Sequence, residues 1–81
     1  MAKVAIMEFD EDKRHFRFLQ SLELSSIPTK GDKVVLDIDG IGYVFEVYDV
    51  HYADRERTDV NVIRRSTITN WNASGFPDIS L

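Results

Sequence analysis

The chain has 81 residues, of which 43% are hydrophobic and 30% are charged, and its formal net charge is −4. This length allows one domain with a thin core, and the composition is typical of a globular protein and not of a disordered one. The sequence contains no cysteine, which excludes disulfides, thiolate catalysis and zinc–thiolate sites.

Membrane and secretion signals are missing from the sequence. No apolar run approaches the ~20 residues that a membrane-spanning helix needs. An apolar patch near the N-terminus ends at the charges of residues 8–12, too early for a secretory signal. We therefore expect a soluble, cytoplasmic protein.

Alternating apolar residues predict the first two strands at residues 3–9 and 15–25, with an exposed charged turn between them. Residues 12–24 have an alternative interpretation as a helix, because Asp12 could cap it and three apolar residues follow at helical spacing. A strand places four large apolar residues on one face instead: Phe16, Phe18, Leu22 and Leu24. The strand is therefore favoured.

The segment from residue 27 to residue 50 is the most regular part of the chain. Pro28 and Gly31 indicate a turn, because proline fixes φ and glycine accepts a positive φ. A strand is predicted at residues 33–39, and the Asp39-Gly40 pair then indicates a hairpin turn.

The next strand, predicted at residues 43–52, breaks strict alternation. Its inward positions alternate as far as Val47, but the next core candidate, Val50, follows three residues later. A β-bulge near Tyr48 and Asp49 would restore the inward direction, and small barrels need such bends in order to close.

The last predicted strand, at residues 60–65, follows a charged loop. Beyond it the sequence is polar and rich in turn residues, yet it contains Trp71 and Phe76. We predict a β-barrel domain at residues 1–66 and a C-terminal tail at residues 67–81, anchored where Trp71 and Phe76 cover the barrel.

A turn and a bulged strand together resemble a family pattern. Ile27-Pro28-x-x-Gly31-Asp32-x-Val34, followed by Phe45-Glu46-Val47-x-x-Val50, resembles small uncharacterised bacterial and phage proteins with barrels of the Src-homology-3 type. The resemblance implies a fold and no activity. The chain departs from this pattern after residue 66, where the tail continues.

These patterns predict one fold class. We expect a mainly β protein that forms a single small five-stranded barrel of the Src-homology-3 type, or a strongly bent antiparallel sheet, with a C-terminal tail. The predicted core residues are Val4, Ile6, Phe16, Phe18, Leu22, Leu24, Val34, Leu36, Ile38, Phe45, Val47, Val50, Val60 and Val62.

Residues that could carry chemistry form no convincing set. The Asp37-x-Asp39-Gly40 sequence is similar to the start of a calcium loop, but a third ligand is missing and a hairpin turn is the better interpretation. His15 and His51 lack the spacing of a metal site. The serines lie in no nucleophile motif. We expect no catalytic residue, no cofactor, no metal and no small-molecule substrate.

A nucleic-acid accessory protein is the alternative function. It would contact phosphates through an arginine-rich patch and stack bases on exposed aromatic rings. The arginines concerned are Arg55, Arg57, Arg64 and Arg65. Acidic residues are interspersed among them, and the net negative charge argues against phosphate binding.

An apolar patch on the outer face of the sheet gives the leading hypothesis. Residues that alternate with the core positions place apolar side chains there, where the tail, a second copy or a partner could cover them. The patch consists of Val35, Val44, Tyr48, Ile63 and Trp71. Unpaired edge strands offer a further contact. The sequence therefore favours a non-catalytic module that binds a protein partner or itself.

Overall fold

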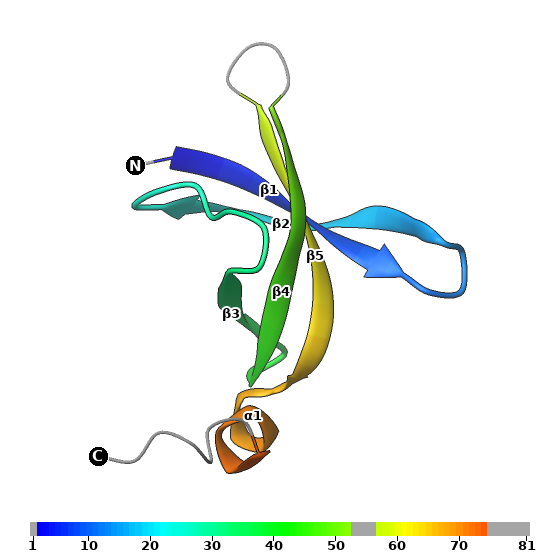
Figure 1. Cartoon of the computed structure of the whole chain (residues 1–81), viewed down its shortest axis with the longest axis vertical. Coiled ribbons are helices and arrows are strands. Elements are labelled where there is room, and N and C mark those ends of the chain that lie inside the picture. Colours follow the sequence, from blue (N-terminus) through cyan, green and yellow to red (C-terminus); the bar gives the residue numbers. More distant parts are fainter. Residues whose placement is uncertain (1, 53–56, 75–81) are drawn as a thin grey trace.

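The computed structural model describes residues 2–52 and 57–74, with side chains described as far as Trp71. Within these residues five strands and one helix follow one another (Figure 1): β1 (Ala2–Asp10), β2 (His15–Leu24), β3 (Lys33–Ile38), β4 (Ile41–Tyr52), β5 (Thr58–Thr67) and α1 (Ile68–Ser74). The strands form one sheet in the order β2-β1-β5-β4-β3. This sheet curls strongly into a half-barrel, which confirms the predicted fold class.

The sheet contains one parallel pair of strands, which the predicted antiparallel sheet lacks. β1 and β2 form a hairpin, and β3, β4 and β5 form an antiparallel meander. After β2 the chain crosses to the opposite edge, so β5 returns beside β1 in the same direction. Alternation along a strand predicts which of its side chains are buried. It does not predict whether two neighbouring strands run parallel or antiparallel, because that depends on the crossover.

Residues 15–24 form a strand, so the helical alternative for residues 12–24 is wrong. The hairpin turn at Asp39-Gly40 is confirmed, with φ angles of 53° and 84°. Two successive residues at positive φ are the signature of a type I′ turn, whose twist matches that of the flanking strands.

The bulge predicted in β4 is confirmed. Val47 and Asp49 pair with consecutive residues of β5, so Tyr48 is an extra residue on its strand. Val50 then points back toward the core. The turn before β3 is bonded to β4 directly before the bulge, because Gly31 N–H donates to the carbonyl of Val47 at 2.9 Å.

The core lies on the inner face of the half-barrel. Its buried residues are Val4, Ile6, Leu36, Phe45, Val47, Val60 and Val62. Partly buried residues that also match the prediction pack against them: Leu22, Leu24, Val34, Ile38 and Val50. Alternation thus identifies the inner face of β1, β3, β4, β5 and the second half of β2.

Phe16 and Phe18, which alternation predicts to be core residues, lie outside the core. Ile6 and Met7 pair with residues of β2 that are two positions apart, so Leu19 is an extra residue on β2. This second bulge reverses the face of every residue that precedes it. Leu19 packs against the core, and Phe18 is left 59% exposed.

The predicted tail begins with a short helix, α1, which the sequence pattern does not predict. Ile68 packs closely on Gly42: a Cβ atom added to Gly42 would lie only 3.1 Å from Ile68 Cγ2. The helix therefore packs against β4, while Phe76 lies outside the described residues. Within the described part of the chain, no helix has the length and apolar character that crossing a membrane would require.

Candidate functional site

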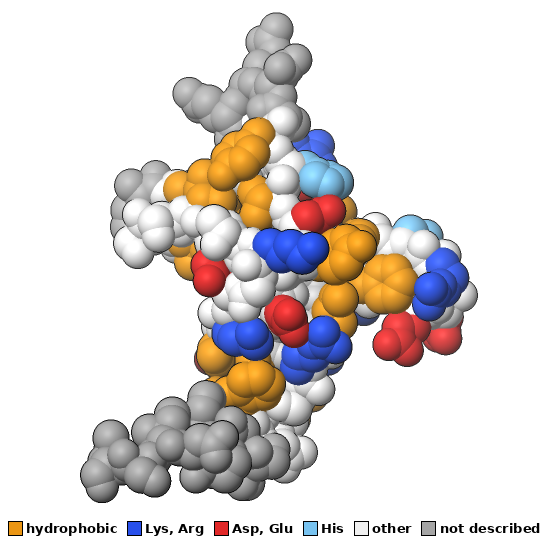
Figure 2. Space-filling view, viewed as in Figure 1, with side chains coloured by type: hydrophobic (Ala, Val, Ile, Leu, Met, Phe, Trp, Pro, Cys, Tyr) orange, Lys and Arg blue, Asp and Glu red, His pale blue; other side chains and the backbone are white. Residues whose placement is uncertain are grey.

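Three aromatic rings from three strands form a row on the outer face of the sheet. The ring centroids of Phe9 and Phe16 are 5.3 Å apart, and those of Phe16 and Tyr48 are 5.9 Å apart. We call these three residues the aromatic row. Together with Ile63 and Arg14 the row lines a groove of about 310 Å³. Figure 2 shows hydrophobic side chains gathered where the β1–β2 hairpin meets β4, with basic side chains on either side.

The bulges at Tyr48 and Leu19 build this row. Phe9 and Phe16 are directly paired across the β1–β2 hairpin, and the bulge at Leu19 turns Phe16 to the outer face. Tyr48 is the extra residue of the β4 bulge and is 50% exposed. Because the rings stand on paired strands and not on loops, their positions are fixed before any ligand binds.

A cation stands at each end of the aromatic row. The guanidinium carbon of Arg14 lies 5.3 Å from the centre of the Phe9 ring, and Lys30 Nζ lies 5.8 Å from that of Tyr48. Both distances are within the range of cation–π attraction. Among the described residues, no carboxylate forms an ion pair with Arg14 or Lys30. The aromatic row thus offers apolar contact along its length and a cation at each end, of which Arg14 also lines the groove.

Arg14 owes its place to the β1–β2 turn. Its φ of 58° is left-handed, and its N–H donates to the carbonyl of Asp10 at 2.7 Å. The Asp10 carboxylate accepts backbone N–H groups from Asp12 at 3.0 Å and Lys13 at 3.2 Å. The Lys13 N–H lowers the pKa of Asp10 most; burial opposes this, and the Asp12 N–H and the charges of Arg17 and Lys13 add to the lowering.

The predicted apolar patch divides into an open part and a covered part. Tyr48 and Ile63 meet in the groove. Val44 is 1% exposed although it lies outside the core cluster, because α1 packs on this end of the outer face. Its pairing partner Val35 is 53% exposed. Trp71 is half-buried, with Lys33 Nζ 6.0 Å from its ring centre.

Alternation misses the other half of the groove. Phe9 already falls on the outer face in the sequence pattern, so it could have been included. Phe16 could not, because the bulge that turns it outward leaves no mark in the spacing of the apolar residues. Arg14 belongs to a mixed-charge turn that reads as solvated.

Each of the three described arginines of the alternative hypothesis is paired with a carboxylate. Arg57 donates to both carboxylate oxygens of Asp59, at 2.9 and 3.2 Å, and this carboxylate raises the pKa of Arg57. Arg65 donates to Glu46 at 2.9 Å. Arg64 is paired on the inner face, as described next. Arg55 lies outside the described residues.

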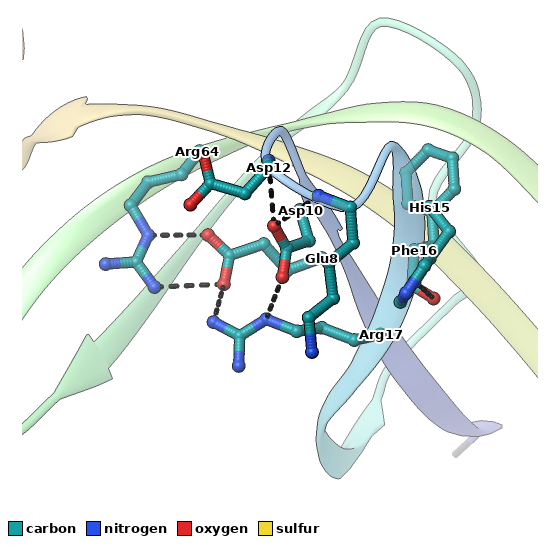
Figure 3. Close-up of polar contacts among 8 residues, drawn as sticks. Glu8, Asp10, Asp12, His15, Phe16, Arg17 and Arg64 are labelled. Carbon is teal, nitrogen blue, oxygen red and sulfur yellow. Dashed lines mark hydrogen bonds and ion pairs between the residues drawn. The ribbon is translucent and has the colours of Figure 1, made fainter.

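A cluster of charges closes one end of the core on the inner face (Figure 3). Arg64 Nη2 donates to Glu8 Oε1 at 3.0 Å, and its Nε lies 2.8 Å from Oε2 in an ion pair that is poorly directed for hydrogen bonding. Arg17 lies 3.6 Å from Glu8 and 3.9 Å from Asp10. The Arg64 guanidinium also stacks 4.6 Å from the ring centre of Tyr43. Two carboxylates of β1 thus face one arginine of β2 and one arginine of β5, and their ion pairs connect the three strands.

Each of the two histidines contacts a residue close to it in the sequence. His51 Nε2 is 3.3 Å from Asp49, whose other oxygen accepts from Asn61 at 2.6 Å. His15 contacts the carbonyl of Phe16. Among the described residues no three His, Cys, Asp or Glu side chains come together as metal ligands.

Comparison of the chain with protein-family models, with curated proteins and with solved structures found no match.

Proposed function

We propose that this chain is a non-catalytic module that binds a protein partner, and that the aromatic row is its binding surface. The observation that carries the proposal is the groove itself: three rings and Ile63 held on paired strands, with Tyr48 half exposed. Exposed apolar patches of this kind mark interaction sites, and rigid aromatic anchors carry much of the energy of protein interfaces.

The chemistry of the lining supports binding. Its described side chains offer ring faces, an aliphatic floor and a guanidinium. An apolar side chain of a partner would fill the groove, while acidic groups beside it would meet Arg14 and Lys30. The proposal includes a cytoplasmic location. The resemblance to small Src-homology-3-type barrels concerns the fold alone and is compatible with the proposal.

A displayed library of random peptides, selected against the immobilised chain, provides a test. Selected peptides should bind the wild-type protein and lose at least about tenfold in affinity on the Tyr48→Ser variant, since a central aromatic anchor is removed. Tyr52→Ser is the matched control: Tyr52 also lies on β4 and is 70% exposed, but it does not line the groove. Its affinity should not change.

Two results would contradict the proposal. One is that selected peptides bind Tyr48→Ser as well as they bind the wild type. The other is that no peptide is selected while a single-stranded oligonucleotide binds with an affinity that falls steeply as salt rises. The second result would favour the nucleic-acid function.

A further inference from the structure

The tip of the β3–β4 hairpin has properties that complement the groove. Ile41, just after the Asp39-Gly40 turn, is 49% exposed. Asp37 and Asp39 are exposed, and within the described part of the chain no cation forms an ion pair with either. The tip is therefore a narrow, acidic projection with an apolar side chain, and the aromatic row that lines the groove has a cation at each end.

The charge of the chain is concentrated near this tip. Residues 32–49 carry five acidic residues and one lysine, which accounts for the whole net charge of −4. Three of the five carboxylates are engaged within the chain: Asp32 in its turn, Glu46 with Arg65 and Asp49 with Asn61. With respect to the residues that the structure describes, Asp37 and Asp39 remain available for an outside contact.

One copy cannot join its own tip to its own groove. Ile41 and Tyr48 lie seven residues apart on the same strand, which spans ~23 Å of extended chain. The β3–β4 turn lies near α1, and the β1–β2 turn lies far from it (Figure 1). The groove residues Phe9, Arg14 and Phe16 stand at the turn end of the β1–β2 hairpin. Only a second molecule can bring the two surfaces together.

We propose that the chain self-associates head to tail, with the β3–β4 hairpin tip of one copy seated in the groove of the next. This inference rests on the proposed function and names a second copy as the occupant. Ile41 would lie on the aromatic row, and Asp37 and Asp39 would be attracted to Arg14 and Lys30. Each bound pair keeps one free tip and one free groove, so the contact can repeat.

The contact is small, so the association is weak. A hairpin tip buries less than the ~1,200 Å² of a stable interface, and we expect a dissociation constant in the range of roughly 0.1–1 mM. Salt should weaken it further, because exposed charges are screened.

Mixing two variants tests this directly. Ile41→Ser keeps the groove and loses the tip, whereas Tyr48→Ser keeps the tip and loses the groove. Sedimentation should show that the wild type forms species larger than a dimer at about 1 mM. Each variant alone should stay monomeric, and their mixture should form a one-to-one pair that grows no further. Two batches of Tyr52→Ser should behave like the wild type.

A second variant covers the case in which Ile41→Ser does not fold. Replacing Asp37 and Asp39 by Asn preserves the turn, since Asn also accepts a positive φ. This variant should associate several-fold more weakly than the wild type and show less dependence on salt. Circular dichroism confirms that each variant is folded.

Three outcomes would overturn the inference: a wild type that stays monomeric at millimolar concentration, a mixture that stays monomeric, or an Ile41→Ser variant that still associates. If self-association fails while selected peptides still bind through Tyr48, the proposed function stands without this occupant. If peptide binding also ignores Tyr48, both proposals fail.

Discussion

At the scale of single residues, the Glu8–Arg64 pair is the most consequential polar contact of the core. The Glu8 side chain is 9% exposed and that of Arg64 is 32% exposed, so the pair is only partly shielded from water. Removing one partner of a buried pair leaves the other without compensation. Because Arg64 also stacks on Tyr43 and Phe45, the guanidinium would stay in place and lose its counter-charge.

Glu8→Gln should therefore lower the free energy of unfolding by about 1–3 kcal/mol, with solvent access to Arg64 limiting the loss. Glu46→Gln is the control, because it breaks the more exposed pair with Arg65 and should cost less than about 1 kcal/mol. Urea unfolding of both variants measures the difference. Equal losses would show that the inner cluster has no special role.

Asp10 predicts a change of stability in acid. Its pKa lies below the usual 3.8, chiefly because Lys13 N–H donates to it. A carboxyl group whose pKa is lower in the folded state stabilises the fold above its unfolded pKa, and this contribution fades as pH falls through the folded value. The stability advantage of the wild type over Asp10→Asn should therefore shrink below about pH 4. Unfolding curves measured from neutral to acidic pH would show this, and an advantage that grew in acid would refute it.

At the scale of elements, the β4 bulge supplies Tyr48 to the groove but contributes no side chain to the core. Deleting Tyr48 should leave Val47 inward, Asp49 outward and Val50 inward, so every other side chain keeps its face. The deletion variant should fold and lose the groove.

Deleting Glu46 instead should move Val47 to the outer face and cost several kcal/mol, because a fully buried side chain becomes exposed. Dispersed amide spectra and unfolding midpoints distinguish the two deletions. If both variants unfold equally, the bulge is part of the core and not an insertion in it.

The two bulges also show what the sequence can predict. In β4 the step from Val47 to Val50 breaks the alternation, and the bulge is visible. In β2 the residues Phe16, Phe18 and Leu22 keep an unbroken period of two, although Leu19 interrupts the pairing. The register of β2 against β1 decides which face Phe16 and Phe18 occupy. The sequence of β2 alone does not contain this register.

The α1 helix is stabilised by its contacts more than by its residues. Seven residues are too few for a stable isolated helix. Thr67 caps it by accepting the Asn70 N–H at 3.2 Å, and Ile68 packs on Gly42. The cap is a signal that the sequence contains, but the packing partner lies far away along the chain.

Thr67→Ala should therefore reduce the stability of α1 by about 1 kcal/mol through loss of the cap. Faster amide exchange within α1 would report the change, while exchange in β1 should be unaffected. Thr69→Ala, at an exposed position in the first turn, is the control. Similar exchange rates in the two variants would show that the cap contributes nothing.

At the scale of the whole molecule, the two faces of the curled sheet have different roles. The inner face holds the continuous core, and the outer face is covered at one end by α1 and open at the aromatic row. Alternation predicted Tyr48 and Ile63 as outer residues because both follow the period of their strands. It could not predict that Phe16 joins them, because curling and a bulge bring these distant strands together.

The most direct measurement is nuclear magnetic resonance of the aromatic and methyl groups while a selected peptide is added. Binding at the groove predicts the largest shifts at Phe9, Phe16, Tyr48 and Ile63, with core groups such as Val60 unchanged. Shifts that follow the free edges of β2 or β3 while the row stays constant would contradict this, because they would indicate strand addition at an edge.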